Sequence, residues 1–156
     1  MTAIRTYADT SVFGGVFDDE FKEPSRAFFD LVQSGRFQLL ISDLSRREVE
    51  EAPAPVRTFF DELLGRMEFV ALDETAIALR DAYIQAGVVG PSSLDDAAHV
   101  AVATVAKAEL IVSWNFRHIV HFEKIRHYNE VNASRGYGSV EIRSPLEVLD
   151  YEDEDI

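Results

Sequence analysis

Four polar residues in distant parts of this 156-residue chain are of the types that bind divalent cations. Asp9 follows a short predicted strand, Glu48 lies in a charged segment, Asp96 begins an alanine-rich segment, and Asn115 follows an apolar run. Oxygen ligands from carboxylates and amides suit Mg²⁺ or Mn²⁺ better than zinc. Such ions activate water and neutralise phosphate charge, so the expected reaction is hydrolysis of a phosphodiester bond.

The elements that carry these residues follow from hydrophobic periodicity and from the positions of glycine and proline. Strands alternating with helices predict an α/β domain with three layers (α/β/α) and a mainly parallel central sheet. Strands are predicted at residues 4–8, 37–41, 67–72, 110–113 and 140–142, and helices at 24–35, 43–52, 59–64, 74–86, 94–107 and 121–132.

This alternation predicts that the four polar residues meet. Sites in open α/β sheets form beyond the carboxyl ends of the strands. Asp9 follows the first strand, Glu48 lies in the helix after the second, and Asn115 follows the fourth. A helix that leads into a parallel strand runs antiparallel to it, so Asp96, at the start of its helix, is expected at the same edge.

The formal charge of −13 argues against passive binding to nucleic acid, which normally needs a basic surface. Part of this charge is the run of four acids at 152–155, so we expect a single domain at residues 1–149 and an acidic, solvated tail at 150–156. A cluster of carboxylates that binds cations would explain part of the remaining acidity.

The composition also favours a cytoplasmic protein. The chain has no cysteine, which fits a reducing compartment. Its first residues lack the apolar run of a signal peptide. No window approaches the roughly 20 apolar residues that a membrane-spanning helix needs, so no membrane association is expected.

Each candidate residue also has a purely structural interpretation. Asp9 could cap a turn, although an acid directly after a central strand favours a function. Glu48 could be one of several solvated helix acids. Asp96 could complement the helix dipole, and Asp95 has an equal claim to that role. Asn115 is a residue type common in loops after strands.

Other residues invite weaker hypotheses. His118 and His121 are three residues apart, but a zinc site would need a third ligand at a recognisable spacing. His99 is expected to be a hydrogen-bonded core residue, and Trp114 to pack rather than to stack on a base. A late set of basic residues is either a path for RNA or ordinary surface charge: Arg117, Lys124, Arg126, Arg135 and Arg143.

Four sequence motifs resemble those of PIN domains, in particular the VapC-type toxins of toxin–antitoxin pairs. The similarity extends from Tyr7 to Pro145. The motifs are Tyr-Ala-Asp-Thr-Ser at 7–11, Ile-Ser at 41–42 followed by Glu48, Asp-Ala-Ala-His-Val-Ala-Val-Ala at 96–103, and Ile-Val-Ser-Trp-Asn-Phe-Arg-His at 111–118.

The resemblance implies an acidic pocket for Mg²⁺ or Mn²⁺, endoribonuclease activity, a homodimer and neutralisation by a cognate antitoxin. It also selects Asp96 over Asp95, because the following alanines match the PIN pattern only from Asp96. One departure stands out. Many PIN domains have Asp where this chain has Asn115, so a second metal ion is expected to bind more weakly.

The sequence therefore predicts a metal-dependent endoribonuclease, the toxin of a type II toxin–antitoxin pair. Asp9 and Asp96 are the expected principal metal ligands. Glu48 is expected to bind directly or through water, and Asn115 to hold a water or the second ion. Two alternatives stay open: a catalytically weak PIN-like module that binds proteins, and a nuclease that acts on DNA.

Overall fold

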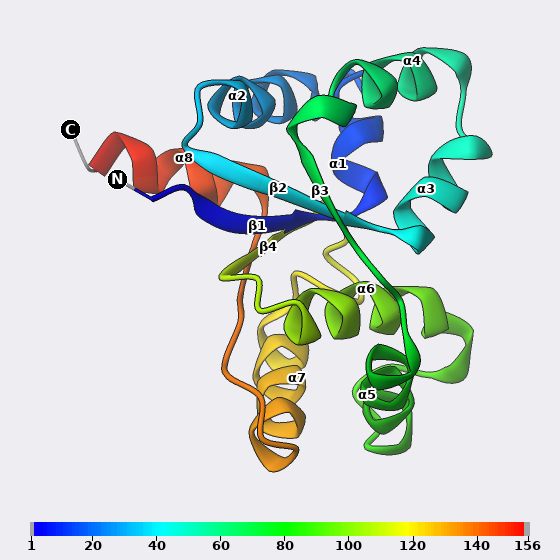
Figure 1. Cartoon of the computed structure of the whole chain (residues 1–156). Coiled ribbons are helices and arrows are strands. Elements are labelled where there is room, and N and C mark those ends of the chain that lie inside the picture. The colour runs from blue at the N-terminus through cyan, green and yellow to red at the C-terminus, as the bar shows by residue number, and fades with distance from the viewer. Residues whose placement is uncertain (1, 155–156) are drawn as a thin grey trace.

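A central sheet organises the computed structural model, which describes residues 2–154 and the side chains of residues 2–149. The sheet has five strands in the order β3-β2-β1-β4-β5, and every neighbouring pair is parallel (Figure 1). The strands are β1 (Ile4–Ala8), β2 (Phe37–Ser42), β3 (Met67–Val70), β4 (Leu110–Val112) and β5 (Glu141–Arg143).

Helices cover both faces of this sheet, which confirms the predicted three-layer α/β/α architecture (Figure 1). One layer contains α1 (Thr10–Gly15), α2 (Lys22–Gln33), α3 (Asp43–Glu50), α4 (Ala54–Glu62) and α8 (Pro145–Glu154). The other contains α5 (Glu74–Gln85), α6 (Leu94–Val105) and α7 (Phe122–Ser134). Two short 3-10 helices, Leu64–Arg66 and Pro91–Ser93, complete the elements that the structure describes.

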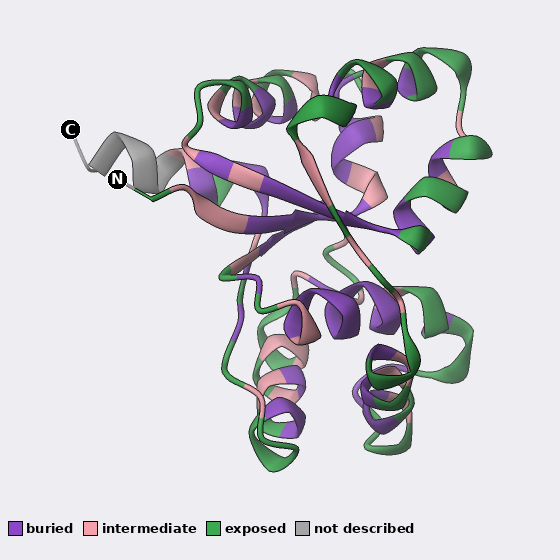
Figure 2. Ribbon diagram, viewed as in Figure 1, coloured by how far each residue is buried: buried purple, intermediate pink, exposed green. Residues whose placement is uncertain are grey.

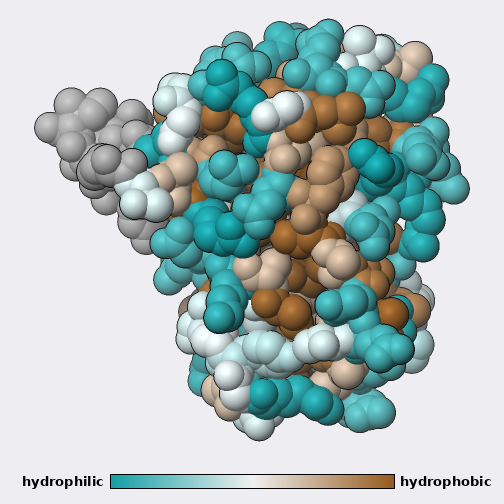
Figure 3. Space-filling view, viewed as in Figure 1, coloured by the Kyte–Doolittle hydropathy of each residue, from teal (hydrophilic) through white to brown (hydrophobic). Residues whose placement is uncertain are grey.

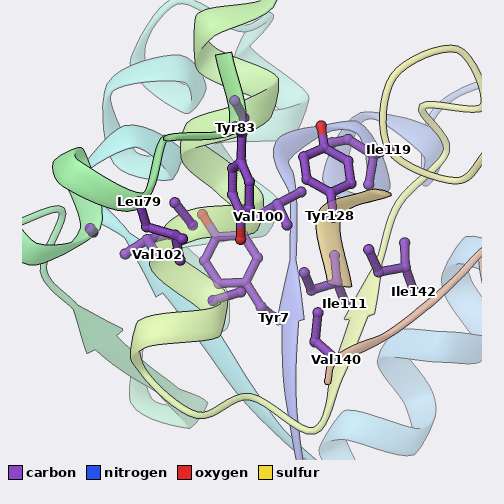
Figure 4. Close-up of a cluster of buried hydrophobic side chains, with 14 of the residues drawn as sticks. Tyr7, Leu79, Tyr83, Val100, Val102, Ile111, Ile119, Tyr128, Val140 and Ile142 are labelled. Carbon is purple, nitrogen blue, oxygen red and sulfur yellow. The ribbon is translucent and has the colours of Figure 1, made fainter. Parts of the chain in front are cut away.

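The two faces of the sheet bury separate hydrophobic cores, because successive side chains of a strand point to opposite faces. Tyr7 and Ile111 pack toward α5, α6 and α7, within the cluster drawn in Figure 4. Their neighbours Ala8 and Val112 pack toward α1, α2 and α4. The central strands are therefore buried on both sides (Figure 2), as the continuous apolar run of β4 indicates.

Two helices that carry candidate residues begin at defined signals. Ser42 caps α3, and its side chain and that of Ser45 each bond to the other residue's backbone N–H in a capping box. Helix α6 follows the 3-10 helix at Pro91–Ser93, and its residues 97–104 are all buried. This burial explains why the segment is rich in alanine and valine on all sides.

The structure adds two helices that the sequence analysis missed, α1 and α8. Helix α1 is only six residues long and ends in Gly14-Gly15, a composition that disfavours a helix. Gly15 is required by packing, because an added Cβ would collide with Ser25 Oγ and would lie 2.7 Å from Trp114 Nε1. Only tertiary contacts reveal this constraint.

Helix α4 begins earlier than predicted, with Pro53 as its N-cap and Pro55 in its first turn. Proline is tolerated there because the first N–H groups of a helix have no partner within the helix. The proposed acidic tail at 150–156 includes residues outside the described part of the chain, although the backbone of α8 continues to Glu154. None of the helices in the described chain is long and apolar enough to cross a membrane.

Apolar side chains also reach the surface on one face of the molecule. In Figure 3 they gather across the middle of the view, where the edge strand β3 lies in Figure 1. Phe69 of β3 is 43 % exposed, and the guanidinium carbon of Arg46 lies 4.5 Å from the centre of its ring. The charged group thus covers part of an exposed edge strand.

Candidate functional site

The predicted site residues lie at the carboxyl-terminal edge of the sheet. Asp9 follows β1 and is the N-cap residue of α1, and Glu48 lies in α3. Asp96 lies in the first turn of α6, and Asn115 lies in the loop after β4. Glu48 interacts electrostatically with both Asp9 and Asp96, and Asn115 is hydrogen-bonded to Asp96. The fold therefore brings these four residues together.

The carboxylate of Asp9 is 4 % exposed and is held by two serine hydroxyls. Ser11 Oγ lies 2.6 Å from Oδ1, and Ser113 Oγ lies 2.9 Å from Oδ2. Each hydroxyl oxygen also accepts a backbone N–H, from Trp114 and Asn115 respectively, at 2.9 Å. Asp9 makes no side-chain cap bond to α1. Its side chain is thus fixed against the β4 loop rather than used to cap a turn.

Glu48 is fixed through a single oxygen. Its Oε1 accepts hydrogen bonds from Thr10 Oγ1 at 2.6 Å and from His99 Nε2 at 2.7 Å. No residue in the described part of the chain donates a hydrogen bond to Oε2. The side chain is 32 % exposed, so it is accessible from solvent.

Asp96 and Asn115 form a pair across the edge of the sheet. The amide nitrogen Nδ2 of Asn115 donates to Oδ1 of Asp96 at 3.0 Å. The amide oxygen of Asn115 accepts the backbone N–H of His118 at 2.9 Å, which fixes the orientation of the amide. In this arrangement the nitrogen, rather than the oxygen, of Asn115 faces Asp96.

The neighbouring acid Asp95 has different surroundings from Asp96. Asp95 is exposed, and its Oδ1 lies 3.5 Å from Nη2 of Arg47 in a solvent-accessible ion pair. Asp96 is only partly exposed and is bonded to Asn115. The structure therefore distinguishes two adjacent acids that helix position alone leaves equivalent.

Burial makes the carboxyl groups of Asp9 and Asp96 harder to ionise. Burial raises the pKa of Asp9, and His99 and the two serine hydroxyls offset this only in part. Burial likewise raises the pKa of Asp96, although His118, Asn115 and His99 act against it. A bound cation would supply the compensation that these two carboxylates lack.

The pKa of Glu48 shifts the other way. Burial disfavours its charged form, but the hydrogen bond and the charge of His99 outweigh this effect and lower the pKa. Burial also opposes the charged form of His99. Its interactions with Tyr7, Glu48 and Asp9 prevail and raise the pKa of His99 to about 10.

The donor types at this edge fit a hard cation, but no complete cage of ligands is formed. Within the described residues, no group of three or more His, Asp or Glu side chains is arranged to hold a metal ion. His118 and His121, which prompted the zinc hypothesis, therefore belong to no such group in the described chain. Mg²⁺ is commonly held by only one or two carboxylates, with waters completing its coordination. Asp9, Glu48 and Asp96 can supply such ligands.

The sequence analysis did not predict that His99, Thr10 and Ser11 bond to the acids of the site. His99 is buried and hydrogen-bonded as predicted, but it contacts Glu48 and Tyr7 rather than an unrelated part of the core. The hydroxyls of Thr10 and Ser11 bond to Glu48 and Asp9. Their position directly after Asp9 is the one sequence signal that could have indicated this role.

Two of the remaining candidates, Trp114 and Arg143, have structural partners. Trp114 packs as predicted: its ring stacks on Phe21 with centroids 4.1 Å apart, and Nε1 lies 2.8 Å from Ser25 Oγ. Among the late basic residues, Arg143 pairs with Glu141 and Glu147, which supports ordinary surface charge at that position. Lys124 and Arg126 line one pocket together with His121 and His127.

Comparison with known proteins gives structural matches only. No protein-family model and no curated protein matches the sequence. A chain of VapBC2 from Rickettsia felis, crystallised with a DNA fragment from its promoter, has 13 % identity and a TM-score of 0.57, covering 90 % of this chain and 98 % of that one. A chain of FitAcB from Neisseria gonorrhoeae has 13 % identity and a TM-score of 0.56, also covering 90 % of this chain and 98 % of that one.

A chain of FitAB bound to an IR36 DNA fragment has 12 % identity and a TM-score of 0.56, covering 90 % of this chain and 94 % of that one. At such low identity the likeness establishes the fold. The chain therefore has a PIN-like α/β/α fold, which it shares with these solved structures.

Proposed function

We propose that this chain is a metal-dependent endoribonuclease that hydrolyses RNA phosphodiester bonds, and that it is the toxin of a type II toxin–antitoxin pair. The observation that carries the proposal is Asp9, an acid that is 4 % exposed at the end of a central strand and interacts electrostatically with Glu48. A buried carboxylate among other acids is costly unless a cation accompanies it. The PIN-like fold and the motifs support the same function.

Each residue has a proposed role at the metal. Asp9 and Asp96 are the principal ligands of Mg²⁺ or Mn²⁺, and Glu48 binds through Oε2, directly or by way of a water. Asn115 keeps Asp96 in place through the bond from Nδ2. When bound, the ion supplies an activated water and neutralises charge on the phosphate.

The serines on either side of Asp9 have a supporting role. Ser11 and Ser113 donate to different oxygens of the Asp9 carboxylate, and both are themselves held by backbone N–H groups. This arrangement fixes the plane of the carboxylate before any ion arrives. Preorganised ligands lower the cost of reaching the reactive geometry.

The proposed partners follow from the resemblance to VapC-type toxins. They are an RNA substrate, a second copy of the chain in a homodimer, and a cognate antitoxin. The formal charge of −13 would repel RNA at a distance, so metal ions are expected to be needed for RNA binding as well as for hydrolysis. An antitoxin segment that is rich in lysine or arginine would complement the same charge.

The direct test uses purified protein and a pool of random-sequence single-stranded RNA, with DNA of matching sequences in parallel. Cleavage of RNA in Mg²⁺ or Mn²⁺, its loss in EDTA and its return when the metal is restored are the expected results. Cleavage of DNA in preference to RNA would favour the DNA-directed nuclease. Cleavage of RNA in EDTA at the same rate would contradict the metal-dependent mechanism.

The hydrogen bond from Asn115 Nδ2 to Asp96, at a position where many PIN domains have an acid, favours one second candidate, a non-catalytic module that binds proteins. Thermal melting with and without Mn²⁺ distinguishes it. An ion that binds the folded state raises the melting temperature by mass action. An unchanged melting temperature, together with intact RNA, would support the protein-binding module.

A further inference from the structure

A line of hydrogen bonds runs through the interior from the start of α3 to Glu48. The Tyr7 hydroxyl lies 2.8 Å from Ser42 Oγ and 2.7 Å from Nδ1 of His99. The other ring nitrogen of His99, Nε2, lies 2.7 Å from Oε1 of Glu48. Tyr7 and Ser42 are fully buried and His99 is 2 % exposed, so solvent does not substitute for these bonds. Figure 4 shows Tyr7 inside the buried cluster.

The chemistry of Glu48 fixes the direction of its hydrogen bond with His99. An ionised carboxylate only accepts hydrogen bonds, so Nε2 of His99 carries the hydrogen that Glu48 receives. In the charged ring Nδ1 also carries a hydrogen, which it donates to the hydroxyl oxygen of Tyr7. Since Thr10 donates to the same Oε1, two donors hold one oxygen of Glu48. The carboxylate is left in one orientation, with Oε2 free of described donors.

We propose that His99, supported by Tyr7, is a positioning residue for Glu48: its Nε2–H fixes Oε1 so that Oε2 alone is presented to the metal or its water. The inference rests on the proposed nuclease function. Glu48 interacts electrostatically with both Asp9 and Asp96. A change in the orientation of Glu48 therefore alters the electrostatic potential at both carboxylates. Neither His99 nor Tyr7 needs to contact substrate or metal in this role.

The position of His99 in α6 supports a specific purpose for the imidazole. Its neighbours Ala98 and Val100 are also buried but apolar. A polar ring in such a helix is unfavourable unless its nitrogens are bonded. If His99 served only to satisfy the buried polar groups around it, both nitrogens would matter equally. Positioning of Glu48 depends on Nε2.

Two substitutions of His99 separate these possibilities. In His99→Gln, the longer side chain can place an amide N–H near the former Nε2 and keep the bond to Glu48. In His99→Asn, the shorter amide can replace only Nδ1 and keeps the bond to Tyr7. Tyr7→Phe keeps the ring of His99 but removes the hydroxyl that bonds to Nδ1. This variant tests whether His99 positions Glu48 even if His99→Asn fails to fold.

Tyr83→Phe is the matched control. Tyr83 belongs to the same hydrophobic cluster as Tyr7 and is fully buried, and its hydroxyl bonds to Asn132 and Thr104 instead of a site residue. For every variant we would determine a crystal structure, measure Mn²⁺ affinity by calorimetry without RNA, and measure kcat and KM on RNA.

We expect Glu48 to keep its orientation in His99→Gln, with Mn²⁺ affinity and kcat close to those of the wild type. In His99→Asn and Tyr7→Phe, Glu48 should turn away, and Mn²⁺ affinity or kcat should fall by about 10- to 100-fold, with KM for RNA little changed. Tyr83→Phe should lower the melting temperature while leaving kcat and Mn²⁺ affinity unchanged.

The inference would be overturned if Glu48 kept its orientation in both His99→Asn and Tyr7→Phe. Equal losses in His99→Asn and His99→Gln, at equal melting temperatures, would also overturn it. A wild-type protein that neither binds Mn²⁺ nor cleaves RNA would instead contradict the proposed function. In that case the orientation of Glu48 in the crystal structures still decides whether His99 positions it.

Discussion

The amide nitrogen of Asn115 donates a hydrogen bond to Oδ1 of Asp96, at 3.0 Å, where many PIN domains would place a second carboxylate. The amide cannot simply be turned over, because its oxygen already accepts the N–H of His118 at 2.9 Å. Asp96 is therefore stabilised by a donor in the metal-free protein. This contact replaces the charge repulsion that an acid at position 115 would cause.

Asn115→Asp should strengthen Mn²⁺ binding in the absence of RNA. The new carboxylate would face Asp96 at close range, so a cation between them would relieve the repulsion. The same substitution should lower the melting temperature in EDTA. Calorimetric titration and melting of both proteins test this, with Asn129→Asp as a control of equal charge in α7. Equal Mn²⁺ affinity in wild type and Asn115→Asp would remove Asn115 from the site.

Asp96→Asn should impair cleavage far more than Asp95→Asn. Asp96 is partly buried and is a proposed ligand, so its loss should lower kcat at least about tenfold. Asp95 forms an exposed ion pair with Arg47 at 3.5 Å, and such pairs contribute about 0–1 kcal/mol to stability. Cleavage rates and melting temperatures of the two variants give the comparison. The reverse order of effects would transfer the metal-binding role to Asp95.

The stability of the metal-free protein should depend on the charge of His99. Its pKa in the folded state is raised to about 10, so the charged ring stabilises the fold fully below its unfolded pKa of about 6.5. That contribution is lost as the pH rises from about 6.5 through 10. Urea unfolding in EDTA at pH 6, 8 and 10 should show a steeper loss for the wild type than for His99→Gln. Parallel pH profiles would contradict the charged state of His99.

The fold was predictable because the local patterns of apolar and polar residues agree with it. The apolar runs at 37–41 and 110–113 indicate buried parallel strands, and the alanine-rich segment after Asp96 indicates a helix buried on all sides. These patterns place Asp9, Glu48, Asp96 and Asn115 at one edge of the sheet. Helix α1 was missed because its Gly15 is dictated by contacts with Ser25 and Trp114 from distant segments.

The details of the site could not be predicted for a similar reason. Tyr7 and His99 are 92 positions apart, and nothing local indicates that their side chains meet. The orientation of the Asn115 amide depends on one backbone N–H three residues later. Residue types and element order therefore predict which groups gather at the edge, while the direction of each hydrogen bond requires the packed structure.

The central claim, that Asp9 holds a catalytic metal ion, is tested most directly by RNA cleavage with wild type and Asp9→Asn in Mn²⁺ and in EDTA. The substitution removes the charge with hardly any change in volume, so the variant should melt as a folded protein. The wild type should cleave only with metal, and Asp9→Asn should not cleave in either condition. Cleavage by a folded Asp9→Asn at the wild-type rate would contradict this mechanism.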